Sequence, residues 1–293
     1  MLQVKKLDVF IGRKKIIQQV DFEVQAGEVI GLIGPNGAGK TTIMKTILGL
    51  TKFTGKIKVN GQTISENDHN ALTKVGALIE HPAIYPFLTG FQNLRLYAKS
   101  EDNLNQVVTE LEMTDYINNK SKDYSLGMKQ KLGIAIALLN QPELVILDEP
   151  MNGLDVEATI LVRKKIKKYA DQGTSFLISS HVLSELQKVM TGAILLNHGE
   201  IVINRSMSEF KSLNQQEYQI LTNDMEKTES LFTERQLSVK KSGIYLIIPR
   251  TEVYRAQELV YANDIKLMEL APKQVSFEQT IVKLLEQQRE TIK

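Results

Sequence analysis

The sequence of 293 residues has no cysteine, no long apolar run and an almost balanced charge. Without cysteine the protein can form no disulfide, thiolate metal site or cysteine nucleophile. The longest apolar run, Leu132 to Leu139, is far shorter than the roughly 20 residues that a helix needs to cross a bilayer. The formal net charge of +2 argues against a dedicated nucleic-acid binder, which usually has a basic surplus. Residues 1–15 lack the apolar block of a signal peptide, so we expect a soluble, cytoplasmic chain.

Hydrophobic periodicity predicts an α/β fold over most of the chain. A length of 293 residues is enough for a large core and for two domains. Helices are expected from about residue 40, over much of 81–140 with loop breaks at Pro82, Pro86 and Gly90, over 156–170 with Asp155 as N-cap, and over 183–190. Strands are expected over 2–10, 16–25, 29–33, 56–60, 74–79, 144–147, 175–179, 193–196 and 200–203.

The composition changes after about residue 212, where glycine becomes rare and polar residues dominate. We therefore place one domain over 1–211 and an accessory domain over 212–293. The accessory domain is expected to contain a strand, a helix, a hairpin, a helix, a strand and a final helix, over 217–222, 224–236, 238–248, 251–263, 265–271 and 275–290. Up to residue 271 these elements have the order β-α-β-β-α-β, which indicates a small ferredoxin-like α+β domain.

A phosphate-binding loop is the most informative motif of the sequence. It reads Gly34-Pro35-Asn36-Gly37-Ala38-Gly39-Lys40-Thr41-Thr42, between an apolar strand and a helical pattern. The glycines let the backbone curl so that several N–H groups point at phosphates, and the positive end of the helix faces them. Lys40 would reach the β- and γ-phosphates of a nucleoside triphosphate, and Thr41 would offer its hydroxyl to Mg²⁺.

Further candidate residues follow three other predicted elements. Asp148 and Glu149 end the apolar strand 144–147. Because side chains alternate along a strand, one carboxylate can hold Mg²⁺ while the other polarises an attacking water, although carboxylates at strand ends are common without such roles. Ser125 stands at the expected N-cap of an apolar helix, which is either an anion site or a plain helix cap. His181 follows strand 175–179, a place where histidine more often makes a structural hydrogen bond.

In their order and spacing, these features resemble the ATP-binding subunit of an ABC transporter over roughly residues 1–210. The resemblance implies a P-loop NTPase (ABC ATPase) core with an antiparallel β subdomain and a helical subdomain at about 81–140. It also implies that Glu149 is the catalytic base, that His181 contacts the γ-phosphate, and that Thr41 and Asp148 hold Mg²⁺. Two subunits of this kind, in a homodimer or heterodimer, would enclose two ATP molecules between them.

The resemblance assigns dimer roles to two further segments. Ser125, Leu126, Gly127 and Met128 correspond to the signature motif, which binds the ATP of the partner subunit. Asn152 and Asp155 belong to the segment that resembles the D-loop, which passes signals across the dimer. Leu126 and Met128 depart from the usual Leu-Ser-Gly-Gly-Gln, but Ser125 and Gly127 remain, so we expect working catalysis.

Two positions near the expected nucleotide also depart from the family pattern. Glu80 stands where the family usually has glutamine, and a carboxylate there carries a charge and can ligate Mg²⁺. The position of the aromatic residue that stacks on adenine is occupied by Ile11, with Phe10 beside it. Either side chain could pack on the base.

Glu80, the run from His81 to Pro86 and the altered signature resemble the ATPases of lantibiotic immunity and bacitracin resistance. This resemblance implies a motor subunit at the cytoplasmic face of the membrane, bound near residues 80–95 and 115–123 to a permease that exports an antimicrobial or amphipathic peptide. An ABC-type ATPase acting on nucleic acid or ribosomes is the alternative, but such relatives usually carry two ATPase units or a long coiled-coil insertion. Retention of Glu149 and His181 argues against a third possibility, a regulator without turnover. We expect no nucleic-acid partner.

Overall fold

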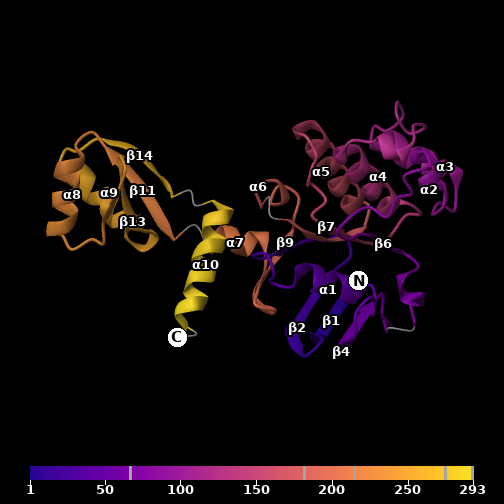
Figure 1. The fold of residues 1–293 in the computed structure, drawn as a ribbon. Coiled ribbons are helices and arrows are strands. Elements are labelled where there is room, and N and C mark those ends of the chain that lie inside the picture. The colour runs from indigo at the N-terminus through magenta and orange to yellow at the C-terminus, as the bar shows by residue number, and fades with distance from the viewer. Residues whose placement is uncertain (66–67, 181–182, 214–215, 274–275, 292–293) are drawn as a thin grey trace. The chain divides into compact units, whose positions relative to one another are not determined.

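The computed structural model describes residues 1–65, 68–180, 183–213, 216–273 and 276–291 (Figure 1). The chain forms two compact units, one of Met1–Arg205 with Gln288–Lys293 and one of Ser206–Gln287. The composition of the sequence predicted a boundary near residue 211. The short helix α7 (Met207–Leu213), which was not predicted, lies in the second unit.

The first unit contains an antiparallel sheet. Its strands are β1 (Leu2–Ile11), β2 (Lys14–Val24), β4 (Phe53–Val59) and β5 (Gln62–Thr63), in the order β2-β1-β4-β5. Alternate residues of β1, such as Leu2 and Val4, are buried, as expected of a sheet with one face on the core. The strands predicted over 2–10 and 16–25 are confirmed and pair antiparallel, although β2 begins at Lys14, two residues before the predicted start.

A six-stranded sheet forms the centre of the first unit. It contains β3 (Val29–Ile33), β6 (Val75–Leu78), β7 (Leu144–Asp148), β8 (Ser175–Ser179), β9 (Gly192–Asn197) and β10 (Glu200–Ser206), in the order β10-β9-β3-β8-β7-β6. From β9 to β6 the neighbouring strands are parallel. Every residue of β3, β7 and β8 is buried, which explains their nearly continuous apolar sequences. The carboxyl ends of the parallel strands therefore meet at one edge.

Helices pack on this sheet and join it to the rest of the unit (Figure 1). They are α1 (Lys40–Ile47), α2 (Gly90–Arg95), α3 (Glu101–Glu110), α4 (Leu126–Leu138), α5 (Val156–Asp171) and α6 (Leu183–Leu186), with 3₁₀ turns at Asn70–Leu72 and Ser121–Asp123. Ile43 and Met44 of α1 are fully buried in one core with residues of both sheets. The predicted N-caps are confirmed, since Asp155 accepts from the Ala158 N–H (2.7 Å) and Ser125 from the Met128 N–H (3.2 Å).

One predicted helix differs from the structure. The mostly helical pattern predicted over 81–140, with loop breaks at Pro82, Pro86 and Gly90, contains three helices, of which the first begins at Gly90. The helix predicted over 183–190 ends at Leu186, and this prediction was wrong at its C-terminal end. After Leu186 the chain forms a tighter, 3₁₀-type turn, in which the Val189 N–H donates to the Leu186 carbonyl. The Thr191 N–H then donates to the carbonyl of Val29 in the central sheet (2.8 Å).

The second unit has the predicted order of elements up to β14. They are β11 (Glu217–Thr222), α8 (Met225–Glu234), β12 (Lys240–Ser242), β13 (Tyr245–Pro249), a 3₁₀ turn (Arg250–Glu252), α9 (Val253–Ala262) and β14 (Leu267–Pro272). The final helix, α10 (Phe277–Thr291), belongs to this unit as far as Gln287. The strands form one antiparallel sheet in the order β12-β13-β11-β14. A separate core lies between this sheet and α8 and α9, around Ile220, Phe232, Leu246 and Val260.

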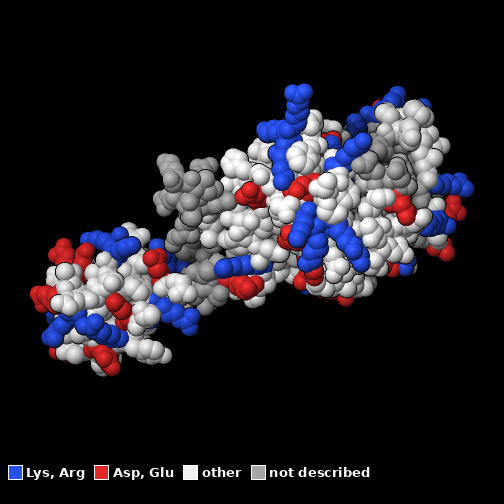
Figure 2. Space-filling model, turned by 90° about the horizontal axis from the view of Figure 1, so that it is seen from below, with Lys and Arg blue, Asp and Glu red and all other residues white. Residues whose placement is uncertain are grey.

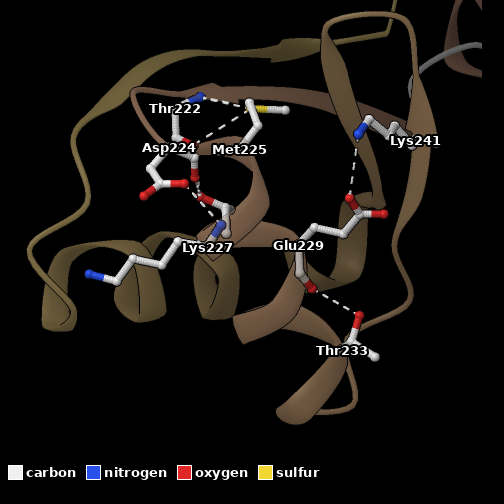
Figure 3. A network of polar contacts seen from close by, with 8 residues as sticks. Thr222, Asp224, Met225, Lys227, Glu229, Thr233 and Lys241 are labelled. Atoms are coloured by element: carbon white, nitrogen blue, oxygen red, sulfur yellow. Dashed lines mark hydrogen bonds and ion pairs between the residues drawn. The ribbon is translucent and has the colours of Figure 1, made fainter.

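Polar contacts at α8 show how this unit holds its first helix (Figure 3). Asp224 caps α8 by accepting from the Lys227 N–H (3.0 Å), and the Thr222 N–H donates to the Met225 sulfur (3.3 Å). At 3.8 Å, Lys241 of β12 forms an ion pair with Glu229 of α8. The helix is therefore joined to strands on both sides of it in the sequence.

Charged side chains are distributed over the surface with both signs mixed. On the face drawn in Figure 2, Lys and Arg lie among Asp and Glu and among wide areas of other residues. Several lysines have an acidic neighbour, as in Lys5–Glu23 (2.9 Å) and Lys15–Asp8 (2.9 Å). In the described part of the chain, every helix is too short or too polar to cross a bilayer.

Candidate nucleotide-binding site

The phosphate-binding loop connects β3 to α1. Gly34 is required at its start, because a Cβ there would lie 2.2 Å from the backbone oxygen of Leu196. Gly39 has a φ of 109°, a left-handed conformation that disfavours residues with a side chain. Among the described residues none caps the N-terminus of α1 with its side chain. The first N–H groups of α1 therefore face the loop, which is the arrangement that binds a phosphate.

Lys40 places its ammonium group inside the loop. Its Nζ donates to the carbonyl oxygens of Gly34 (2.7 Å) and Pro35 (3.2 Å), and the residue is only 8% exposed. Burial lowers the pKa of Lys40, while the carboxylates of Glu149 and Asp148 oppose that change. The Lys40 ammonium therefore lies near the carboxylates of Asp148 and Glu149, at a place where phosphate oxygens can bind it.

Asp148 ends β7 directly beside Ser179 of β8, its partner in the parallel register. Its carboxylate accepts from the Thr41 hydroxyl (2.7 Å) and from the Ser179 hydroxyl. Hydroxyl and carboxylate oxygens are the ligands that Mg²⁺ prefers, so Thr41 and Asp148 fit this ion. No group of three or more His, Cys, Asp or Glu side chains that could hold a metal is found among the described residues. Phosphate oxygens and water would have to complete the coordination of Mg²⁺ here.

Glu149 has a strained backbone held by hydrogen bonds. Its φ is 51°, and its N–H donates to the carbonyl (3.2 Å) and hydroxyl (3.0 Å) oxygens of Ser179. Its own carbonyl accepts from the Gln130 side chain of α4 (3.2 Å). A left-handed non-glycine residue costs about 1–3 kcal/mol and persists only where its surroundings hold it, often at functional sites. These contacts thus hold the backbone of Glu149 in place at the pocket.

A pocket of about 690 Å³ brings most of the predicted residues together. It is lined by Ile11, Ile16, Asn36, Gly37, Gly39, Lys40, Thr41, Thr42, Glu80, His81, Asp148, Glu149 and Asn152. Ala38, within the loop, is buried, with 3% of its surface exposed. Of the two candidates for packing on adenine, Ile11 lines the pocket, whereas Phe10 is 48% exposed with the Lys15 ammonium 5.8 Å from its ring. His181 lies outside the described residues.

Glu80 lines this pocket from the loop after β6. Its backbone is left-handed, with a φ of 59°, and its carboxylate forms an ion pair with Lys45 of α1 (2.6 Å). Sequence reasoning missed Lys45, Gln130 and Ser179. For Ser179 a signal existed, because the parallel register places the ends of two neighbouring strands side by side.

The residues expected to form the signature motif lie at the start of α4, close to Gly153 of the same chain. Leu126 is 68% exposed, and a Cβ added to Gly153 would lie 2.5 Å from its Cδ2 atom. A Cβ added to Gly127 would lie 3.0 Å from the Gly153 oxygen. Among the described residues that line the pocket, none comes from Ser125 to Met128. Ser125 and Leu126 are exposed, and Gly127 and Met128 are half-buried.

Known proteins resemble this chain over much of its length. Residues 17–152 match the family described as ABC transporter. The chain is 34% identical over 292 residues to the uncharacterized ABC transporter ATP-binding protein YdbJ of Bacillus subtilis, covering 97% of this chain and 94% of the relative. It is 30% identical over 297 residues to the bacitracin transport ATP-binding protein BcrA of Bacillus licheniformis, covering 97% of each. A solved ATP-binding subunit of an ABC transporter has a TM-score of 0.68 and 29% identity, over 73% of this chain and 92% of that one. The chain therefore belongs to the ATP-binding proteins of ABC transporters, and its first unit is an ABC ATPase domain.

Proposed function

We propose that this protein is the ATP-hydrolysing motor of an exporter for antimicrobial peptides. It would work as a dimer at the cytoplasmic face of the membrane, bound to a separate integral-membrane permease. The observation that carries the proposal is the single pocket shared by Lys40, the Thr41–Asp148 pair and Glu149. The similarity to BcrA supports a peptide antibiotic as the exported substrate.

The residues of the pocket suit ATP hydrolysis. The loop N–H groups and Lys40 would hold the phosphates, and Ile11 or Phe10 would pack on adenine. Thr41 and Asp148, with Glu80 within the same pocket, would hold Mg²⁺, which neutralises charge on the phosphates when it is bound. Glu149 would accept a proton from the attacking water. His181, which follows β8 in the sequence, would contact the γ-phosphate.

A second copy or a paralogue would complete the site. Ser125, Gly127 and the exposed Leu126 start α4 outside the pocket of their own chain, so they can face the ATP of a partner. Asn152 lines the pocket, and the Asp155 side chain caps α5. The short stretch between them would report the state of one ATP to the partner subunit.

An exposed aromatic pair offers a contact for the permease. Tyr85 and Phe87 are 47% and 67% exposed, with ring centroids 5.8 Å apart. The fully buried Asn93 holds their loop, because it accepts from the Tyr85 N–H (2.7 Å) and donates to the carbonyls of Tyr85 (3.1 Å) and Thr89 (2.9 Å). The same loop begins at Glu80, so movement in the pocket can be transmitted to this surface.

The test uses cells that produce the protein with its permease. The parent should raise the concentration of bacitracin needed to stop growth, and Glu149→Gln should abolish both that protection and ATP turnover while leaving ATP binding intact. Glu101→Gln, at the exposed start of α3, is the matched control and should behave as the parent. Protection by Glu149→Gln equal to that of the parent would contradict the motor function. Binding to ribosomes or nucleic acid without any protection would favour the alternative class of soluble ABC-type ATPase.

A further inference from the structure

The ion pair between Lys45 and Glu80 joins the nucleotide pocket to α1. Lys45 lies four residues after Thr41, so both side chains project from the same face of the helix, about 6 Å apart along its axis. Glu80 lines the pocket together with Thr41 and Asp148, the two residues that fit Mg²⁺. The Lys45 ammonium, bonded to Glu80 at 2.6 Å, therefore acts on a carboxylate that lies close to the expected metal.

The pair can rearrange without disturbing the core. The side chains of Lys45 and Glu80 are 35% and 56% exposed, which means that water can replace either partner. The backbone of Glu80 is left-handed, which is unusual for a glutamate; it sets the direction of the Cα–Cβ bond, while the side-chain torsions remain free to turn the carboxylate. An exposed carboxylate with a fixed backbone has two competing neighbours here, the ammonium group of Lys45 and a cation in the pocket.

We propose that Lys45 is a positioning residue that neutralises Glu80 at the edge of the pocket and competes with the metal of the nucleotide for its carboxylate. This inference rests on the nucleotide site of the proposed function. Without metal, Lys45 neutralises the Glu80 carboxylate, which would otherwise repel the negatively charged triphosphate. With metal, the Glu80 carboxylate can bind the cation only after it has turned away from Lys45. Because the ion pair must break first, it lowers the affinity for the metal.

These two effects have opposite signs, which makes the proposal testable by binding alone. The full-length chain with Glu149→Gln, which prevents turnover, serves as the parent. ATP affinity is measured in EDTA, and Mn²⁺ affinity in the presence of ATP is measured by electron paramagnetic resonance. The variants are Lys45→Met, Glu80→Gln, the double variant and Lys45→Arg, with Lys52→Met as an exposed lysine control.

Lys45→Met should weaken metal-free ATP binding by about three- to five-fold and tighten Mn²⁺ binding by about the same factor, the range of an exposed ion pair. Both changes should vanish in the Glu80→Gln background, and Lys45→Arg should restore the parent values because it keeps the charge. Lys52→Met should change neither affinity. Equal effects of Lys45→Met with and without Glu80 would overturn the proposal, since Lys45 would then act on the phosphates directly. A parent that binds no ATP would refute the proposed function, and this inference with it.

Discussion

Replacement of Ser179 by alanine tests how the site holds its catalytic groups. The Ser179 hydroxyl donates to the Asp148 carboxylate and accepts from the Glu149 N–H (3.0 Å). Asp148 is only 5% exposed, so water cannot easily replace the lost donor. A hydrogen bond to a charged group contributes about 1.5–3 kcal/mol. Since each 1.36 kcal/mol is a factor of about ten, Ser179→Ala should lower kcat by about 10- to 150-fold.

The assay is phosphate release at saturating ATP over a range of Mg²⁺ concentrations. Ser179→Ala should also need more Mg²⁺ to reach half its maximal rate, because Asp148 loses one of the two hydroxyls that orient it. Ser175→Ala is the matched control. Ser175 is equally buried on the same strand, but its hydroxyl bonds to Gln25 (2.9 Å) at the opposite end, so the Mg²⁺ dependence should not change. A Ser179→Ala enzyme within twofold of the parent, or equal losses in both variants, would refute the reasoning.

Three further predictions concern the loop, the pH dependence and the two units. Gly34→Ala should abolish ATP binding in equilibrium titrations, because its Cβ would meet the backbone of Leu196 at 2.2 Å, whereas Gly243→Ala, in an open turn, should bind normally. Burial, with help from a neighbouring carboxylate, raises the pKa of Tyr169 to about 12. The unfolded chain therefore loses the Tyr169 proton at a lower pH than the folded chain does, so the free energy of unfolding should fall between pH 10 and 12. In urea unfolding across that range, the free energy of unfolding of Tyr169→Phe should fall by about 1–2 kcal/mol less than that of the parent. A chain ending after Arg205 should still bind ATP, since the first unit contains the whole pocket; a folded truncated protein without binding would contradict this.

Local signals in the sequence predicted several elements with small errors. The hydroxyl of Ser125 and the carboxylate of Asp155 cap α4 and α5 as expected, because a helix start depends on residues within three positions of it. The second unit also follows its predicted order, since apolar alternation and the turn at Ser242-Gly243 are short-range signals. Predictions failed where distant contacts decide the path, as at the end of α6, where Thr191 bonds to Val29.

By itself, the sequence determined the phosphate-binding loop, the two carboxylates at the end of β7 and the order of strands and helices. These features depend on neighbouring residues, whose types set backbone conformation and periodicity. Only the tertiary structure decided that Ser179 orients Asp148, that Gln130 supports Glu149 and that Lys45 pairs with Glu80. The partners in these pairs come from different elements, which meet through the register of the parallel sheet and the packing of helices on it. No local pattern in the sequence contains that information.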